Sequence, residues 1–205
     1  MLRPGYSIRK DWVNGPNSVF RSVLGAFLNQ SYEADYDAFY FMEIDAVPVK
    51  ELWLNQLIAE AFYYPRAAIR GSRYRGDGWD VFLQQMPDDL IMHINGNAIY
   101  NLRHPWLRWL YERLEEEKDS DNNTVAFDLR MANLTMDAKT GAVPEYADAY
   151  DALVPAGEDP YASDSTLIGN YANTLLNESY ELGVYVRHGQ LDKKGCNILG
   201  ARISA

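Results

Sequence analysis

Two acidic residues, Glu43 and Asp45, directly follow a short apolar run at 38–42. The run is too short for a helix and rich in aromatic residues, so it predicts a buried β-strand. Side chains two residues apart on a strand point to the same side, and we therefore expect both carboxylates to face one cavity at the strand's end. In open α/β sheets ligands bind at that edge.

Paired carboxylates at such an edge are suited to a hard divalent cation, Mn²⁺ or Mg²⁺, which prefers oxygen ligands and joins them to substrate phosphates. The pair Glu43 and Asp45 therefore predicts a diphosphate clamp. The simpler alternative is two solvated acids at a strand end, which is the more frequent case for an isolated Glu-x-Asp.

A second polar segment, Asn95, Gly96 and Asn97, follows a strand candidate at 91–93. Glycine allows a ligand to approach the backbone closely, and asparagine amides can donate to and accept from ligand hydroxyls. The segment is suited to binding a polar ligand, with an ordinary Asn-Gly turn as the equal alternative. His93, on an apolar strand, is expected to be a core histidine.

Near the C-terminus, His188 is followed by Gly189 and, a few residues later, by Lys193 and Lys194. A neutral imidazole is an acceptable ligand for Mn²⁺, and ammonium groups offset phosphate charge. A surface histidine beside a basic tail is the alternative. The arginines between 66 and 75 form a basic patch, for which a solvated face is the expected explanation.

The elements that must position these residues alternate between strands and helices. We expect a turn at 14–17 that starts a helix, a helix with Pro48 in its first turn, and helices at 105–117 and 125–134. Further strands are expected at 67–70, 167–168 and 183–187, a helix at 170–181, and a long acidic loop at 137–165. This order predicts an α/β fold with a mostly parallel sheet flanked by helices, as one domain over 1–205.

The composition excludes several classes of function. Apolar residues make up 47% and charged residues 23% of the 205, which is typical of a folded globular chain. The net charge of −10 would repel a phosphate backbone, so a general nucleic-acid binder is not expected. No apolar run is long enough for a membrane span, so the chain as given is expected to be cytoplasmic. Cys196 has no cysteine partner and is expected to be an ordinary thiol.

The whole phrase at 39–54, Phe-Tyr-Phe-Met-Glu-Ile-Asp-Ala-Val-Pro-Val-Lys-Glu-Leu-Trp-Leu, resembles the aspartate-x-aspartate segment of GT-A glycosyltransferases. The resemblance implies that Asp45 is the direct metal ligand and Glu43 the supporting acid. It also implies that 93–100 lines the donor-sugar pocket and that His188 completes the metal shell. The lysines that follow His188 would then meet the diphosphate.

Two further residues take their expected roles from this resemblance. Asp128 stands where inverting members carry the base that an attacking hydroxyl needs, and Arg21 would belong to the nucleotide site. Only 37 residues precede the strand, whereas the family usually has two strand–helix units there, so a shortened nucleotide-binding half is expected. Whether configuration is retained or inverted stays open.

The expected function is metal-dependent transfer of a sugar from a UDP- or GDP-sugar to a hydroxyl of a glycan or another acceptor. Two alternatives from other classes remain. One is a carbohydrate-binding or interaction module that keeps the fold without the chemistry, and the other is a metal-dependent hydrolase that uses the same acids.

Overall fold

The computed structural model describes residues 10–29, 36–63, 67–73, 93–120, 124–157, 161–170 and 183–188. Within these ranges the helices are α1 (Lys10–Asn29), α2 (Trp53–Tyr63), α4 (Pro105–Glu116), α5 (Phe127–Thr140) and α6 (Pro144–Leu153). The strands are β1 (Ala38–Phe41), β2 (Val47–Pro48), β3 (Ile69–Arg73), β4 (Ile94–Asn101), β5 (Ala162–Asp164), β6 (Ile168–Asn170) and β7 (Val186–His188).

The strands form two mixed sheets. In the larger, with order β1-β4-β3-β5, strand β4 runs antiparallel to both neighbours and β3 is parallel to β5. In the smaller, with order β2-β7-β6, β2 is antiparallel and β6 is parallel to β7. The α/β class is therefore confirmed, but the prediction of a mostly parallel sheet is wrong, because apolar runs in a sequence do not encode strand direction.

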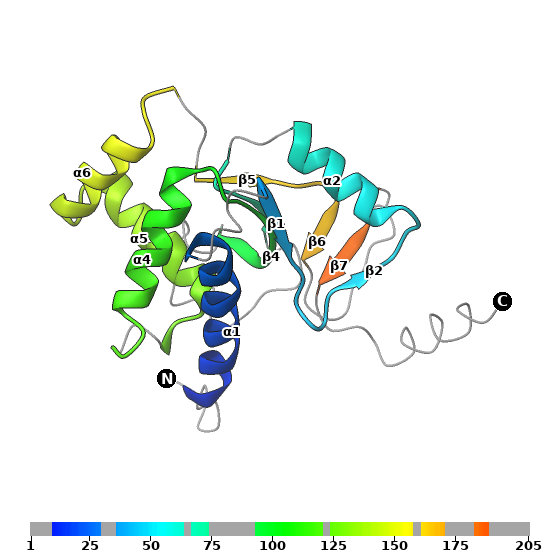
Figure 1. Ribbon diagram of the computed structural model, residues 1–205, viewed down its shortest axis with the longest axis horizontal. Helices are drawn as coiled ribbons and strands as arrows, with labels where there is room; N and C mark the ends of the chain where they lie inside the picture. The colour runs from blue at the N-terminus through cyan, green and yellow to red at the C-terminus, as the bar shows by residue number, and fades with distance from the viewer. Residues whose placement is uncertain are drawn as a thin grey trace, which may run out of the picture.

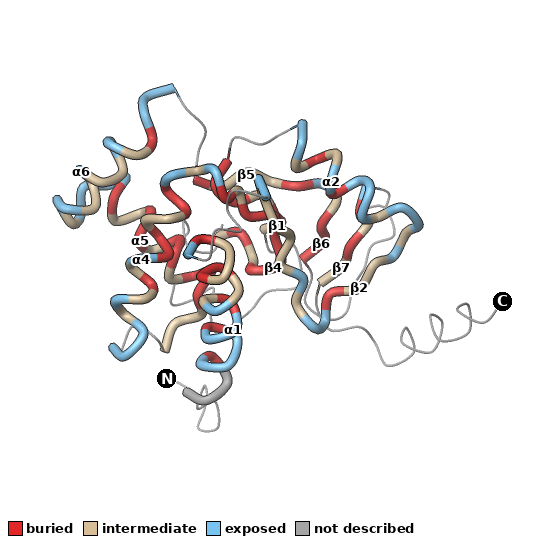
Figure 2. Tube along the Cα trace, in the orientation of Figure 1, coloured by how far each residue is buried: buried red, intermediate tan, exposed pale blue. Residues whose placement is uncertain are grey.

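The long strand β4 is the centre of the fold. Helices α1, α4, α5 and α6 lie on one side of the larger sheet, and α2 with the smaller sheet lies on the other (Figure 1). Tyr100 and Ala98 of β4 belong to the core under the first group of helices, while Ile99 belongs to the core shared with α2. Figure 2 shows the buried residues gathered where these layers meet. Strand β4 is thus buried on both faces.

Because β1, β3 and β5 run in one direction, their carboxyl ends share one edge of the larger sheet. Glu43 and Asp45 follow β1 at this edge, and β4 begins there. Open parallel α/β sheets bind ligands at such an edge, whereas here the antiparallel strand β4 separates β1 from β3. The strands expected at 38–42, 67–70, 167–168 and 183–187 and the helices expected at 105–117 and 125–134 are present, with shifted ends.

The predicted turn at 14–17 is wrong, because α1 runs through it and contains Pro16. The polar residue that suggested a turn, Asn17, is buried and makes tertiary contacts instead. Its Nδ2 donates to Val125 O at 2.8 Å, and its Oδ1 accepts from Phe127 N at 2.8 Å. Asn17 therefore attaches α1 to the start of α5.

The prediction that Pro48 opens a helix is also wrong. Pro48 lies in β2 opposite Val186, and α2 begins later, at Trp53. Strand β2 is the outer strand of its sheet, where a proline without an N–H is tolerated.

The acidic segment 137–165 is not a loop in its described part. Helix α5 continues to Thr140 and ends at Gly141, whose φ of 67° is left-handed, and α6 and β5 follow. Helix α6 has no fully buried residue and packs at the border of the main core. Tyr146 and Tyr150 attach it edge-on to the rings of Trp109 and Trp106.

The segment 95–97 is not a turn either, since it lies inside β4. The register between β4 and β3 shifts here, between the pairs Gly71–Ala98 and Arg73–Ile94, so the segment is an irregular part of an extended strand. Residues 91–92 of a predicted strand and 171–181 of a predicted helix lie outside the described residues, and Asn170 belongs to β6. None of the described helices is long and apolar enough to cross a membrane.

Replacing Asn17 tests the link between α1 and α5. Asn17→Ala removes two hydrogen bonds and leaves Val125 O and Phe127 N without these partners, so we expect a loss of about 2–3 kcal/mol in the free energy of unfolding. Urea denaturation measures this loss. The control is the exposed Asn55→Ala on α2, which should change stability by less than about 0.5 kcal/mol. Equal effects of the two changes would contradict the role of Asn17.

Candidate metal centre

Three side chains with metal-ligating atoms meet at the carboxyl edge. His188 Nε2 lies 2.9 Å from Glu43 Oε2 and 3.1 Å from Asp45 Oδ1. One ligand atom from each residue lies within 4.8 Å of the other two. Sequence analysis predicted these three residues as metal ligands, and the structure brings them together as one acid–histidine group.

The two acids are aimed by a turn rather than by strand alternation. Strand β1 ends at Phe41, and Ala46 N donates to Glu43 O at 3.0 Å, which closes a turn over 43–46. Ile44 stands at the turn's tip, fully exposed. The turn, and not the period of the strand, therefore points both carboxylates at His188.

His188 is oriented from its other side by Asn170. The last residues of the parallel strands β6 and β7 face each other, and His188 Nδ1 donates to Asn170 Oδ1 at 3.0 Å. This bond fixes the ring so that Nε2 faces the acids, as second partners of ligating histidines commonly do. Sequence analysis missed Asn170, because only the parallel pairing of β6 with β7 reveals its position.

The electrostatics of the group describe its metal-free state. Burial alone would lower the pKa of His188, but the close carboxylate of Glu43 and the charge of Asp45 outweigh burial, and the pKa is raised. Without a metal, the imidazole is thus stabilised as a cation between two acids. A metal ion would replace that proton at Nε2.

Glu43 Oε2 is an acceptor left without an aligned hydrogen bond. The atom is buried, and its short contact with Nε2 does not have hydrogen-bond geometry. The side chain of Asp45, by contrast, is 56% exposed and opens the group to solvent. A buried carboxylate oxygen beside an imidazole nitrogen and a second carboxylate is suited to a cation.

Gly96 lies against this group because it has no side chain. A Cβ there would lie 2.4 Å from Phe127 Cζ and 3.2 Å from Glu43 Oε1. Its N–H donates to Asp128 Oδ2 at 3.0 Å, and its carbonyl accepts from Tyr100 Oη at 2.8 Å. The backbone of β4 therefore forms a wall beside Glu43.

The two flanking asparagines have different roles. Asn95 Oδ1 accepts from Asn97 N at 2.9 Å, within the strand. Asn97 is fully buried, and its Oδ1 accepts from Tyr40 Oη at 2.7 Å. Burial, partly opposed by this hydrogen bond and supported by the charge of Glu43, raises the pKa of Tyr40 and keeps it a neutral donor. Asn97 Nδ2 is buried and makes no hydrogen bond to the described residues.

Asp128, the expected base, is buried rather than exposed in the first turn of α5. Its carboxylate accepts from Gly96 N and, at 2.8 Å, from Leu129 N, and it lies 3.7 Å from His93 Nε2. Burial alone would raise its pKa, but the hydrogen bond and charge of His93, with the two backbone donors, lower it. An ionised carboxylate with its donors already in place positions β4 better than it accepts a proton. The contact between Asp128 and His93 could not be predicted from the sequence.

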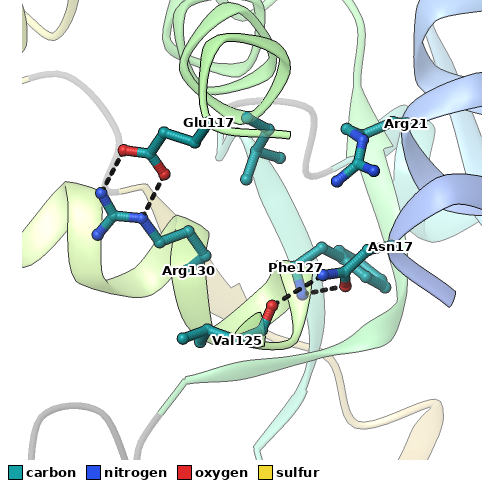
Figure 3. Close-up of a pocket in the computed structure, with 7 residues that line it drawn as sticks. Asn17, Arg21, Glu117, Val125, Phe127 and Arg130 are labelled. Atoms are coloured by element: carbon teal, nitrogen blue, oxygen red, sulfur yellow. Dashed lines mark hydrogen bonds and ion pairs between the residues drawn. The ribbon is translucent and has the colours of Figure 1, made fainter. Parts of the chain in front are cut away.

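Arg21 lies elsewhere, beside a small hollow between α1, α4 and α5 (Figure 3). Its Nε is 3.6 Å from Glu115 Oε1, and the bidentate pair of Arg130 with Glu117 closes the opposite side. The volume of about 10 Å³ is at the limit for a single water molecule, so the hollow does not fit a nucleotide. The other expected phosphate-binding residues, Lys193 and Lys194, lie outside the described residues.

Comparisons of the chain with protein-family models, with curated proteins and with solved structures each gave no match. Function is therefore inferred from the geometry of the acid–histidine group and its neighbours.

Gly96→Ala tests the wall beside Glu43. The new Cβ would overlap the ring of Phe127, so we expect a loss of about 1–3 kcal/mol in the free energy of unfolding, measured in urea. Gly15→Ala is the matched control, because a Cβ there has no atom within 4 Å and the site is helical. The control should be neutral or stabilising by up to about 1 kcal/mol. Equal stability of the two variants would contradict the close approach at Gly96.

The raised pKa of His188 predicts a pH dependence in protein treated with chelator. A raised folded-state pKa gives stability that is complete below the unfolded pKa of about 6.5 and is lost as pH rises through the folded value. The advantage of the native chain over His188→Gln in unfolding free energy should therefore shrink from pH 5.5 to 8.5. With Mn²⁺ added, the advantage of the native chain should instead grow from pH 5.5 to 8.5, because the metal binds the neutral imidazole. A difference independent of pH in both conditions would contradict this assignment.

Proposed function

We propose that the chain is a metal-dependent glycosyltransferase that moves a sugar from a nucleotide-diphosphate donor to a hydroxyl acceptor. The proposal depends mainly on one observation, the convergence of Glu43, Asp45 and His188 at the carboxyl edge of the strands. It is also supported by the resemblance of the segment around Glu43 and Asp45 to the metal motif of GT-A enzymes. The GT-A fold is part of this proposal.

The donor set fits a divalent ion such as Mn²⁺ or Mg²⁺. Ligands at right angles on an ion with bonds of about 2.1 Å lie about 3.0 Å apart. The Nε2 to oxygen distances of 2.9 and 3.1 Å agree with that spacing. Two carboxylates and one imidazole leave coordination positions open, and these would take diphosphate oxygens.

When bound, such an ion acts as a Lewis acid that stabilises the negative charge on the departing diphosphate. The chain supplies the remaining functions. The missing side chain of Gly96 leaves room for Glu43 and Phe127 against β4, and Asn97 carries a buried amide on the same strand. Asn95 adds a second amide at that edge. Asp128 holds the amide of Gly96 and so fixes the wall against which the sugar would lie.

Mn²⁺ affinity tests the ligand assignment directly. Asp45→Asn should weaken Mn²⁺ binding at least about tenfold, measured by calorimetry or by electron paramagnetic resonance of free Mn²⁺, because an amide replaces a charged ligand. Asp37→Asn is the matched control, since Asp37 is highly exposed and pairs with Arg103. Its affinity should be unchanged. Equal Mn²⁺ affinity in both variants would remove Asp45 from the site.

The function is tested separately with nucleotides and sugar donors. With Mn²⁺ present, UDP or GDP should raise the melting temperature, and Asp45→Ala should abolish metal-dependent turnover of the matching sugar nucleotide. Transfer to an acceptor, seen by product analysis, supports a glycosyltransferase. Release of free sugar or phosphate without any need for acceptor favours a hydrolase. Glycan binding that a chelator does not affect, with no nucleotide effect, favours a binding module.

A further inference from the structure

The outer face of α2 exposes a row of apolar side chains. Leu54, Ile58 and Phe62 stand four residues apart, so they lie on one side of the helix. Leu52 and Tyr63 add to the row at its two ends. All five side chains are between 48% and 76% exposed. We call this set the α2 outer face.

The α2 outer face carries no charge. The one ionisable carboxylate of the helix, Glu60, points inward, where it accepts from Arg70 Nε at 2.9 Å and from Ser165 Oγ at 2.5 Å. The other exposed polar residues of the helix, Asn55 and Gln56, are neutral. In a chain of net charge −10, two copies repel each other across most contacts. Glu51, exposed next to Leu52, is the acid that borders this face in the sequence, and the rest of the face lets identical copies approach without opposing acids.

Leu52, at one end of the α2 outer face, has an unusual backbone conformation. Among the described residues, Leu52 is the non-glycine residue with a positive φ, which is 57°. A left-handed conformation is unfavourable for a leucine, and its side chain is also 68% exposed to water. Burial of Leu52 against a partner would offset both costs.

The size of the face is close to what an association needs. Phe62 and Tyr63 alone expose on the order of 300 Å² of aromatic side chain, and the five residues together about 600 Å². A standard interface buries about 800 Å² on each partner. Asn55 and Gln56 at its border would bring the area near that value.

We propose that the α2 outer face is the contact surface of a two-fold dimer of this chain. The α2 helices of the two copies pack antiparallel, with the ridge of Leu54, Ile58 and Phe62 fitting the grooves of its symmetry mate. A lipid surface is a poorer occupant, because the exposed part of α2 has no basic residue to attract headgroups. This inference goes beyond the proposed sugar transfer and does not depend on it.

Dimer formation would also affect the metal centre. The inner side of α2 packs Leu57 against Ile168 and Val186, in the strands that end with Asn170 and His188. A partner on the outer side holds α2 against those strands.

The experiment measures mass in solution from about 1 to 200 μM by light scattering and sedimentation. The native chain is expected to shift from monomer to dimer with concentration. Ile58→Glu with Phe62→Glu should stay monomeric with an unchanged circular dichroism spectrum. Val19→Glu, at an exposed apolar residue of α1 that is outside this face, should dimerise as the native chain does. A native chain that is monomeric throughout, or a double variant that still dimerises, overturns the proposal.

A second measurement separates a two-fold contact from non-specific association. Ile58→Cys in a Cys196→Ser background should form a disulfide-linked dimer under mild oxidation, because Ile58 is central in the row and meets its own copy at the axis. Val19→Cys in the same background should not. Equal cross-linking of the two variants overturns the proposal, and so does flotation of a monomeric chain with neutral phosphatidylcholine vesicles.

Discussion

The bond from the Gly96 amide to the buried Asp128 carboxylate joins the helical layer to the central strand, and the candidate site depends on it. Asp128 belongs to α5, and Gly96 lies in the strand that pairs with both β1 and β3. Since Glu43 rests against Gly96, the position of that acid follows from the same contact. His93 and the backbone donors keep Asp128 ionised within the protein, so the link is a charge-assisted one. A helix far along the sequence thereby sets one wall of the acid–histidine group.

The other half of the group is set by parallel pairing in the smaller sheet. Asn170 and His188 end adjacent strands, and the hydrogen bond between their side chains turns the imidazole toward the acids. Two independent supports therefore converge, one through β4 and one through β6 and β7. Helix α2 connects them, because it packs on Ile99 of β4 and on Val186 of β7 within a single core.

The sequence predicted those parts that depend on residue type and local period. The apolar run before Glu43 became β1, and the apolar stripe of 105–117 became α4, since burial of one face or of a short strand leaves a local pattern. Strand direction left no such pattern, and neither did contacts between distant residues. Asn17 was misread as a turn residue because its partners, Val125 and Phe127, lie more than a hundred residues away. Asn170 and the pairing of His93 with Asp128 stayed invisible for the same reason.

Pro48 has a consequence for how this molecule meets its surroundings. It occupies β2, the outermost strand of the smaller sheet, opposite Val186. Because proline has no N–H, an added strand from another chain would lack one backbone hydrogen-bond donor along that edge. Growth of the sheet by strand addition is thereby discouraged a few residues before α2 begins. The effect of Pro48 is confined to the β2 border, since β6 forms the opposite edge of the same sheet.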